Sequence, residues 1–234
     1  MSAPVSLRAF AEGVTKDYVV AAALQLGGWA SRIDPARYAS GTERPCIALP
    51  GVYETWHFMR PMIEALHRRG HPVHVVSALH CNRRPVIDSA ELVARFIADR
   101  GLDDVFIAAH SKGGLIGKYA MLKLDPDHRL VRMVAVATPF SGSRYARWAP
   151  NSTLRAFRAD DPTTALLASE DLVNERIVSV FSSFDPIVPE GSELPGAHNV
   201  RLPSGGHFDV LRDRRAIDIV TTEAARPSAR NCDH

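Results

Sequence analysis

The sequence has few cysteines, and they follow no recognisable pattern. The three present, Cys46, Cys81 and Cys232, are odd in number and lack the spacing of metal ligands. A disulfide framework and a metal centre are therefore not expected. The pattern indicates either a reducing compartment or simply inert thiols.

The sequence also has almost no excess of positive or negative charge. The formal net charge is only +2 over 234 residues, and the arginine pairs are interleaved with apolar or acidic residues. Proteins that bind nucleic acids usually carry a strongly basic face, so we expect no nucleic-acid partner. Internal repeats and low-complexity segments are also missing, which gives no sign of a repeat architecture.

Long hydrophobic runs do not occur. The longest apolar stretch near the N-terminus, residues 18–30, is too short to cross a bilayer and is interrupted by Gln25 and two glycines. The first residues, MSAPVSLRAFAEG, lack a basic segment followed by an apolar one, so no signal peptide is expected. These absences favour a cytoplasmic protein without stable membrane insertion.

What the sequence does contain is an alternation of short apolar runs and longer amphipathic ones. Hydrophobic residues make up 46% of the chain, enough for one sizeable core in a single domain. The apolar runs predict six strands, at 46–49, 73–76, 105–109, 131–137, 177–181 and 199–202. The segments between them predict helices at 56–69, 86–100, 113–124 and 208–222. This order predicts an α/β fold with a mostly parallel sheet, in which ligands bind at the carboxyl ends of the strands.

Three segments fall outside the alternation. Residues 1–44 predict an N-terminal arm with a helix near 14–32, and residues 223–234 predict a C-terminal tail. Residues 139–176 form a long insertion after the fourth strand. Insertions of this length in a compact domain are usually functional, so we predict a small cap or lid there. A pair of plain connecting helices is the alternative.

A serine directly after the third predicted strand is the candidate nucleophile. The segment from Ala109 to Gly114 reads AHSKGG, so Ser111 lies between a strand and a helix and is flanked by small residues. Such a context is typical of the nucleophile elbow, a sharp turn that lifts the serine away from the sheet. The alternative is a serine in an ordinary turn.

A serine nucleophile also needs donors for the oxyanion that forms during attack. The backbone N–H of Lys112 is one candidate, because it lies at the start of the helix that follows the serine. The second should come from the loop LPGVYETW after the first strand, where Gly51 permits a close approach. Val52 is the preferred donor and Tyr53 the second choice; an ordinary Pro-Gly turn is the alternative.

The base that activates the serine should be a histidine oriented by a carboxylate. Of the ten histidines, His207 follows the last predicted strand on the glycine-rich segment SGGHF. The carboxylate is expected from the segment FDPIVP after the fifth strand, which contains Asp185, with Glu190 and Glu193 as alternatives. The non-catalytic interpretations are a surface histidine and an Asp-Pro turn.

Four motifs (LPGVY, AHSKGG, FDPIVP and GGHF) resemble those of the α/β-hydrolase superfamily, over about residues 45–222. The resemblance is to small bacterial lipases and carboxylesterases with an AHSxG elbow, and the segment ATPFSGS is similar to their TPxxGS segment. It implies a six-stranded sheet that begins at the third strand of the full fold. It also implies ester hydrolysis through an acyl-enzyme, without metal or organic cofactor.

Two positions depart from the pattern of that superfamily. Pro50-Gly51 replaces the His-Gly pair found in the oxyanion loop of lipases. Lys112 follows the nucleophile where several relatives carry a less charged residue, and its ammonium could face solvent or favour anionic acyl groups.

The leading hypothesis is an esterase or lipase that acts on a small-molecule ester with a small-to-medium acyl group. The predicted substrate-binding residues are Tyr53, Phe140, Trp148, Leu154 and Phe157. A thioesterase or acyltransferase would use the same Ser-His-Asp triad. A catalytically silent hydrolase fold used for binding is the third hypothesis, although a binding module has no need of all three triad members.

Overall fold

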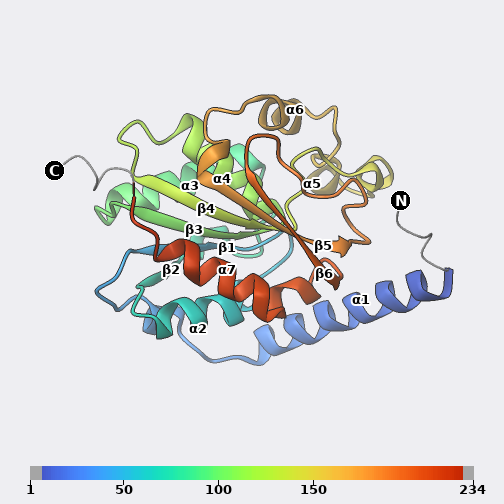
Figure 1. The fold of residues 1–234 in the computed structure, drawn as a ribbon, viewed down its shortest axis with the longest axis horizontal. Coiled ribbons are helices and arrows are strands. Elements are labelled where there is room, and N and C mark those ends of the chain that lie inside the picture. The colour runs from blue at the N-terminus through green and yellow to red at the C-terminus, as the bar shows by residue number, and fades with distance from the viewer. Residues whose placement is uncertain (1–6, 229–234) are drawn as a thin grey trace.

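A six-stranded, all-parallel sheet forms the centre of the computed structural model, which describes residues 7–228 (Figure 1). Its spatial order is β2-β1-β3-β4-β5-β6. The bounds are β1 Cys46–Leu49, β2 Val73–Val75, β3 Val105–His110, β4 Leu130–Val136, β5 Ile177–Phe184 and β6 His198–Gly205. The prediction of six strands in a parallel sheet is confirmed.

Helices cover both faces of this sheet (Figure 1). They are α1 Leu7–Ala30, α2 Arg60–Arg68, α3 Val86–Asp99, α4 Lys112–Lys123, α5 Ser152–Arg155, α6 Pro162–Ser169 and α7 Arg214–Ala224. Short 3₁₀ helices lie between them: η1 Pro35–Tyr38, η2 Trp56–Met59, η3 Ser77–Leu79, η4 Arg144–Trp148, η5 Asn174–Arg176 and η6 Asp209–Arg212. Two predicted helices are thus each split into a 3₁₀ turn and an α-helix, at 56–68 and 209–224.

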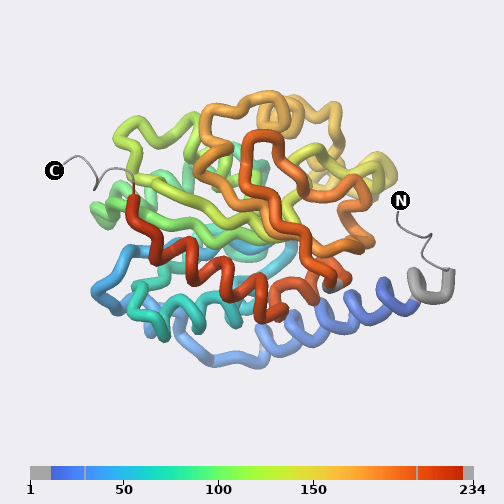
Figure 2. Tube along the Cα trace, in the orientation of Figure 1, coloured from blue at the N-terminus to red at the C-terminus, as the bar shows by residue number. Residues whose placement is uncertain are grey.

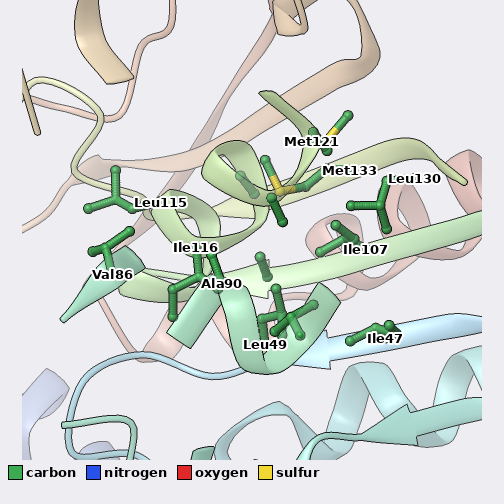
Figure 3. Close-up of a cluster of buried hydrophobic side chains, with 14 of the residues drawn as sticks. Ile47, Leu49, Val86, Ala90, Ile107, Leu115, Ile116, Met121, Leu130 and Met133 are labelled. Atoms are coloured by element: carbon green, nitrogen blue, oxygen red, sulfur yellow. The ribbon is translucent and has the colours of Figure 1, made fainter. Parts of the chain in front are cut away.

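Alternate residues of each strand enter two separate cores, which explains why the strands are apolar at every position. Ile47, Leu49 and Ile107 pack against α3 and α4, in the cluster that Figure 3 shows. Cys46 and Ala48 face the opposite way and pack with residues of α2 and α7. Strands buried on both faces lack the polar alternation of a half-exposed strand.

The strands β5 and β6 extend further than the sequence predicts. They end at Phe184 and Gly205, whereas the apolar runs end near 181 and 202. The pairing continues through Ser182 with Leu202 and Phe184 with Gly205. The hydroxyl of Ser182 also donates to the carbonyl oxygens of Phe184 and Gly206, at 2.8 and 2.9 Å. The extension carries the following loops beyond the end of the central strands.

Helix α1 and the insertion at 139–176 lie outside the sheet. Figure 2 shows α1 along the outside of the chain trace, where it packs against η2 and η6. It is longer than the helix predicted near 14–32. The insertion contains η4, α5, α6 and η5. Residues 1–6 of the predicted arm and 229–234 of the predicted tail lie outside the described residues.

A buried lysine ties the insertion to the sheet's helical layer. The ammonium of Lys118, on α4, donates to the carbonyl oxygens of Leu167 and Glu170, at 2.6 and 2.8 Å. Burial lowers the pKa of Lys118 to about 8, against the opposing effect of Asp171 and Glu170. The folded protein therefore binds fewer protons at this site than the unfolded chain does at mildly alkaline pH.

The free energy of unfolding should consequently rise with pH more steeply in the wild type than in Lys118→Met. Between pH 7.5 and 9.5 we expect the wild type to gain roughly 1–2 kcal/mol relative to this variant. Urea denaturation at the two pH values measures the difference. Lys123→Met is the matched control, because Lys123 contacts the same Glu170 from the surface. The prediction would be contradicted if the free energy of unfolding of the wild type, minus that of Lys118→Met, stayed constant or fell as the pH rises.

Candidate active site

Ser111 occupies a sharp turn between β3 and α4. Its backbone has φ 51° and ψ −119°, a conformation that few non-glycine residues adopt. The N–H of Ser111 donates to the carbonyl oxygen of Val136 at 2.8 Å. The hydroxyl of Thr138 donates to the carbonyl oxygen of Ser111 at 3.0 Å. Bonds to β4 and to the loop after it thus hold the strained turn from both sides.

Two glycines allow this turn to sit close to its neighbours. A Cβ at position 113 would lie 2.0 Å from the carbonyl oxygen of Leu49, and one at position 114 would lie 2.0 Å from Oγ1 of Thr138. Any side chain at either position would push α4 away from the sheet. The small residues of the AHSKGG motif therefore have a structural cause.

His207 and Asp185 meet at the ends of β6 and β5. Nδ1 of His207 lies 2.7 Å from Oδ2 of Asp185. The other carboxylate oxygen, Oδ1, accepts the N–H groups of Ile187 and Val188 at 2.8 and 2.9 Å. Both oxygens of Asp185 are thus fixed. An ionised carboxylate at Nδ1 keeps the proton on that nitrogen, which makes Nε2 the nitrogen able to accept another proton.

The contact shifts the pKa of both groups. Burial by itself lowers the pKa of His207, but the charge and hydrogen bond of Asp185 outweigh it, with smaller contributions from Glu54 and Asp17, so the pKa is raised. Burial by itself raises the pKa of Asp185, but the charge and hydrogen bond of His207 and the two backbone N–H groups outweigh it, so the pKa is lowered. Both shifts favour the ion pair.

Another candidate carboxylate on this loop has a different partner. Glu190 accepts from Nε of the exposed Arg144 at 2.6 Å. Of the carboxylates considered, Asp185 is the one bonded to His207.

The predicted oxyanion donors come from the start of α4 and from the loop after β1. Lys112 is the first residue of α4, where N–H groups have no partner within their own helix. In the other loop, the N–H of Gly51 donates to Oε2 of Glu54 at 2.8 Å. A Cβ at position 51 would lie 2.2 Å from Oε1 of Glu54, so glycine is needed for this carboxylate to fold under the loop.

Glu54 is also connected to His207, through the side chain of His110. Nδ1 of the fully buried His110 lies 2.9 Å from the carboxylate of Glu54, and Nε2 of His110 lies 2.9 Å from the carbonyl oxygen of His207. The sequence alone did not single out Glu54 or assign a role to His110. The histidine directly before the serine could have indicated such a network, because it follows a buried strand and a buried imidazole requires polar partners.

A cavity of about 830 Å³ is lined by six of the predicted site residues. Its lining includes Ser111, His207, Val52 and Tyr53, together with Leu154 and Phe157 of the insertion and Val14, Tyr18, Ala21, Ala22 and Gln25 of α1. The contribution of α1 was not predicted, because nothing in its sequence indicates which surface it covers.

Two predicted substrate-binding residues lie elsewhere. Phe140 is 1% exposed and packs in the core cluster beside α4, and it is not among the cavity-lining residues. A short turn, in which its N–H donates to the carbonyl oxygen of Thr138, directs it inward. Trp148 ends η4, is 82% exposed and is likewise not among the cavity-lining residues.

The side chain of Lys112 reaches neither solvent nor the cavity. It is 2% exposed, and its ammonium donates to the carbonyl oxygen of Asn82 at 2.8 Å and to that of Arg84. Burial lowers its pKa to about 8, although Asp88 acts in the opposite direction. Lys112 thus fastens the loop before α3 to the start of α4.

Residues 7–228 contain neither a metal-binding cluster nor a membrane-spanning helix. No group of three or more His, Cys, Asp or Glu side chains in that range could hold a metal ion. None of the helices in the same range combines the length and hydrophobicity of a bilayer-crossing segment.

The sheet order, the elbow after β3 and the flanking helices define an α/β-hydrolase fold. Solved structures with this fold include a lipase of Bacillus licheniformis in its mature form (TM-score 0.65, 16% identity, 83% of this chain and 94% of that one). Lipase B of Aspergillus fumigatus is similar over 82% of this chain (TM-score 0.66, 16% identity), which spans about half (54%) of the fungal chain. An extracellular α/β-hydrolase of a Paenibacillus species matches 79% of this chain and 100% of its own (TM-score 0.52, 16% identity). The sequence matches no protein-family model and no curated protein.

Proposed function

We propose that the protein is a serine hydrolase that cleaves carboxylic esters through an acyl-enzyme. The observation that carries the proposal is the pairing of a strained serine elbow with a carboxylate-bound histidine on one largely apolar cavity. Solved lipases of the same fold support it. Because one fold hosts many reactions, the proposal rests on the site.

In this mechanism, Oγ of Ser111 attacks the ester carbonyl carbon while its proton passes to Nε2 of His207. The carbonyl oxygen becomes an oxyanion, which accepts the backbone N–H groups of Lys112 and Val52. Collapse of the tetrahedral intermediate breaks the ester C–O bond, and His207 returns the proton to the departing alcohol. Water then repeats the sequence on the acyl-enzyme and releases the carboxylic acid, and Asp185 stabilises the imidazolium in both halves.

The cavity suits an apolar acyl group of small-to-medium size. A volume of about 830 Å³ lies within the range of small-molecule sites. Leu154 and Phe157, from the insertion, provide apolar surface on one side, and Tyr18 and Ala21, from α1, provide it on the other. Activity against p-nitrophenyl esters of graded chain length, compared with acyl-thioesters, tests this substrate class.

A fluorophosphonate probe tests the nucleophile directly. We expect covalent labelling of the wild type and none of Ser111→Ala, because the probe needs an activated hydroxyl. Ser143→Ala is the matched control: Ser143 lines the same cavity, but its hydroxyl donates to the carbonyl oxygen of Ile187, so labelling should persist. An unlabelled but folded wild type, or labelling that survives in Ser111→Ala, would refute the proposal.

A further inference from the structure

A buried carboxylate from helix α1 binds the loop that carries His207. Asp17 is 1% exposed. Its Oδ2 accepts the N–H of His207 at 2.8 Å, and its Oδ1 accepts the N–H groups of Phe208 and Asp209 at 2.8 and 3.1 Å. Three consecutive backbone donors, starting at His207 itself, thus converge on one side chain that is 190 residues away in the chain.

The loop is shaped to admit this carboxylate. Gly206 has φ +105°, and a Cβ there would lie 2.5 Å from Oδ1 of Asp17. A side chain at position 206 would therefore both strain the backbone and displace Asp17. Successive N–H groups that point into one concavity form a site for an anion, which here is filled by the protein's own carboxylate.

His207 is consequently held at three separate points. Asp17 binds its backbone N–H, His110 lies 2.9 Å from its carbonyl oxygen, and Asp185 binds Nδ1 of its ring. The first two bonds fix the peptide units around the residue, and the third fixes the orientation of the imidazole. Without the bond to Asp17, the imidazole of His207 would still be bonded to Asp185, but the N–H of its backbone would no longer be held.

Contacts other than those of Asp17 also attach α1 to the rest of the protein. Val20 is buried, and Ala21 and Leu24 pack against the core cluster shared with α2 and α7. On the surface, Lys16 forms an ion pair with Asp209 at 2.6 Å, which joins the same two elements. Attachment alone would not require one carboxylate to accept three consecutive N–H groups, the first of which is that of His207.

We propose that Asp17 is a positioning residue, which holds the backbone of His207 where Nε2 can exchange a proton with Ser111. Helix α1 then belongs to the catalytic apparatus in two ways: it fixes the base through Asp17 and forms a wall of the substrate cavity. The inference rests on the proposed ester hydrolysis, because a positioned base has meaning only for a reaction that uses it.

The variant Asp17→Asn removes the bond to His207, together with the charge of Asp17, and can keep the other two bonds. The amide oxygen of the new side chain can still accept from Phe208 and Asp209, whereas its NH₂ group cannot accept the N–H of His207. We expect kcat for p-nitrophenyl ester hydrolysis to fall about 10- to 100-fold with KM within about twofold, because a displacement near 1 Å can cost two orders of magnitude. Asp17→Ala should fall at least as far.

Rates are expressed per folded molecule, taken from the amplitude of thermal unfolding, so a variant that folds only in part is still measurable. Lys16→Gln is the matched control: it removes the neighbouring ion pair between the same elements and should keep the wild-type kcat. A wild-type kcat in Asp17→Asn, or an equal loss in Lys16→Gln, would overturn the inference. A wild type that neither hydrolyses esters nor takes up the probe would instead overturn the proposed function.

Discussion

Asp185→Asn should lower kcat for ester hydrolysis by about 10⁴-fold in a protein that still folds. The amide oxygen of the introduced asparagine can keep the bonds to the N–H groups of Ile187 and Val188. Its NH₂ group would then face Nδ1 of His207 and donate to it. Because a neutral imidazole carries one N–H, the proton would move to Nε2, and Nε2 could no longer accept a proton from Ser111.

The same variant should change how the residual activity depends on pH. The charge and hydrogen bond of Asp185 raise the pKa of His207 against the opposing effect of burial. Losing that charge lowers the pKa, so the imidazole stays neutral to a lower pH. The acid limb of the kcat profile should therefore move to lower pH in Asp185→Asn.

Steady-state kinetics from pH 5 to 9, with thermal melting as a check on folding, measure both effects. Glu190→Gln is the matched control, because Glu190 follows on the same loop but pairs with Arg144; it should retain the wild-type kcat. A loss of less than tenfold in Asp185→Asn, or an equal loss in Glu190→Gln, would contradict the assignment.

The parts of the fold that the sequence predicts are those governed by local pattern. Strands such as Val105–His110 are apolar at nearly every position because both faces are buried, and that signal is contained in a few consecutive residues. The elbow is equally local, because Ser111, Gly113 and Gly114 lie within four positions. A side chain at position 113 would collide with Leu49 and one at position 114 with Thr138, so both positions require glycine. Local patterns were sufficient for the sheet and for the candidate nucleophile.

The parts that the sequence did not predict depend on contacts between distant segments. Asp17 and His207 are 190 residues apart, and Glu54 and His110 are 56 apart. An isolated acid on a helix or in a loop has many possible partners, and only the folded chain selects one. Phe140 and Trp148 illustrate the same limit for the insertion, since their apolar character did not indicate which side of the segment faces the cavity.

His110 and Glu54 form a second buried acid–histidine pair. Nε2 of His110 faces the carbonyl oxygen of His207, which only accepts, so this nitrogen must carry a proton. Nδ1 lies 2.9 Å from the carboxylate of Glu54. Both ring nitrogens of His110 therefore have a polar partner inside the protein, and His110 links Glu54 to the loop that carries His207.

Replacing Glu54 by Ala should break this network and cost about 3–5 kcal/mol of folding free energy, because it leaves a buried charge or donor without its partner. The N–H of Gly51 would also lose its acceptor, which frees the loop that carries Val52. We expect kcat to fall about 100-fold through misplacement of the oxyanion donor and of His207. Urea denaturation and steady-state kinetics measure the two losses.

Glu54→Gln distinguishes a requirement for hydrogen bonds from one for charge. The amide oxygen of the introduced glutamine can accept the N–H of Gly51, and its NH₂ group can donate to Nδ1 of a neutral His110, whose Nε2–H still reaches the carbonyl oxygen of His207. Every buried polar group then keeps a partner, so this variant should lose less than about 1 kcal/mol and stay within about tenfold of the wild-type kcat. Equal damage in Glu54→Gln and Glu54→Ala would mean that the charge of Glu54, and not its bonding pattern, supports the loops on either side of the cavity.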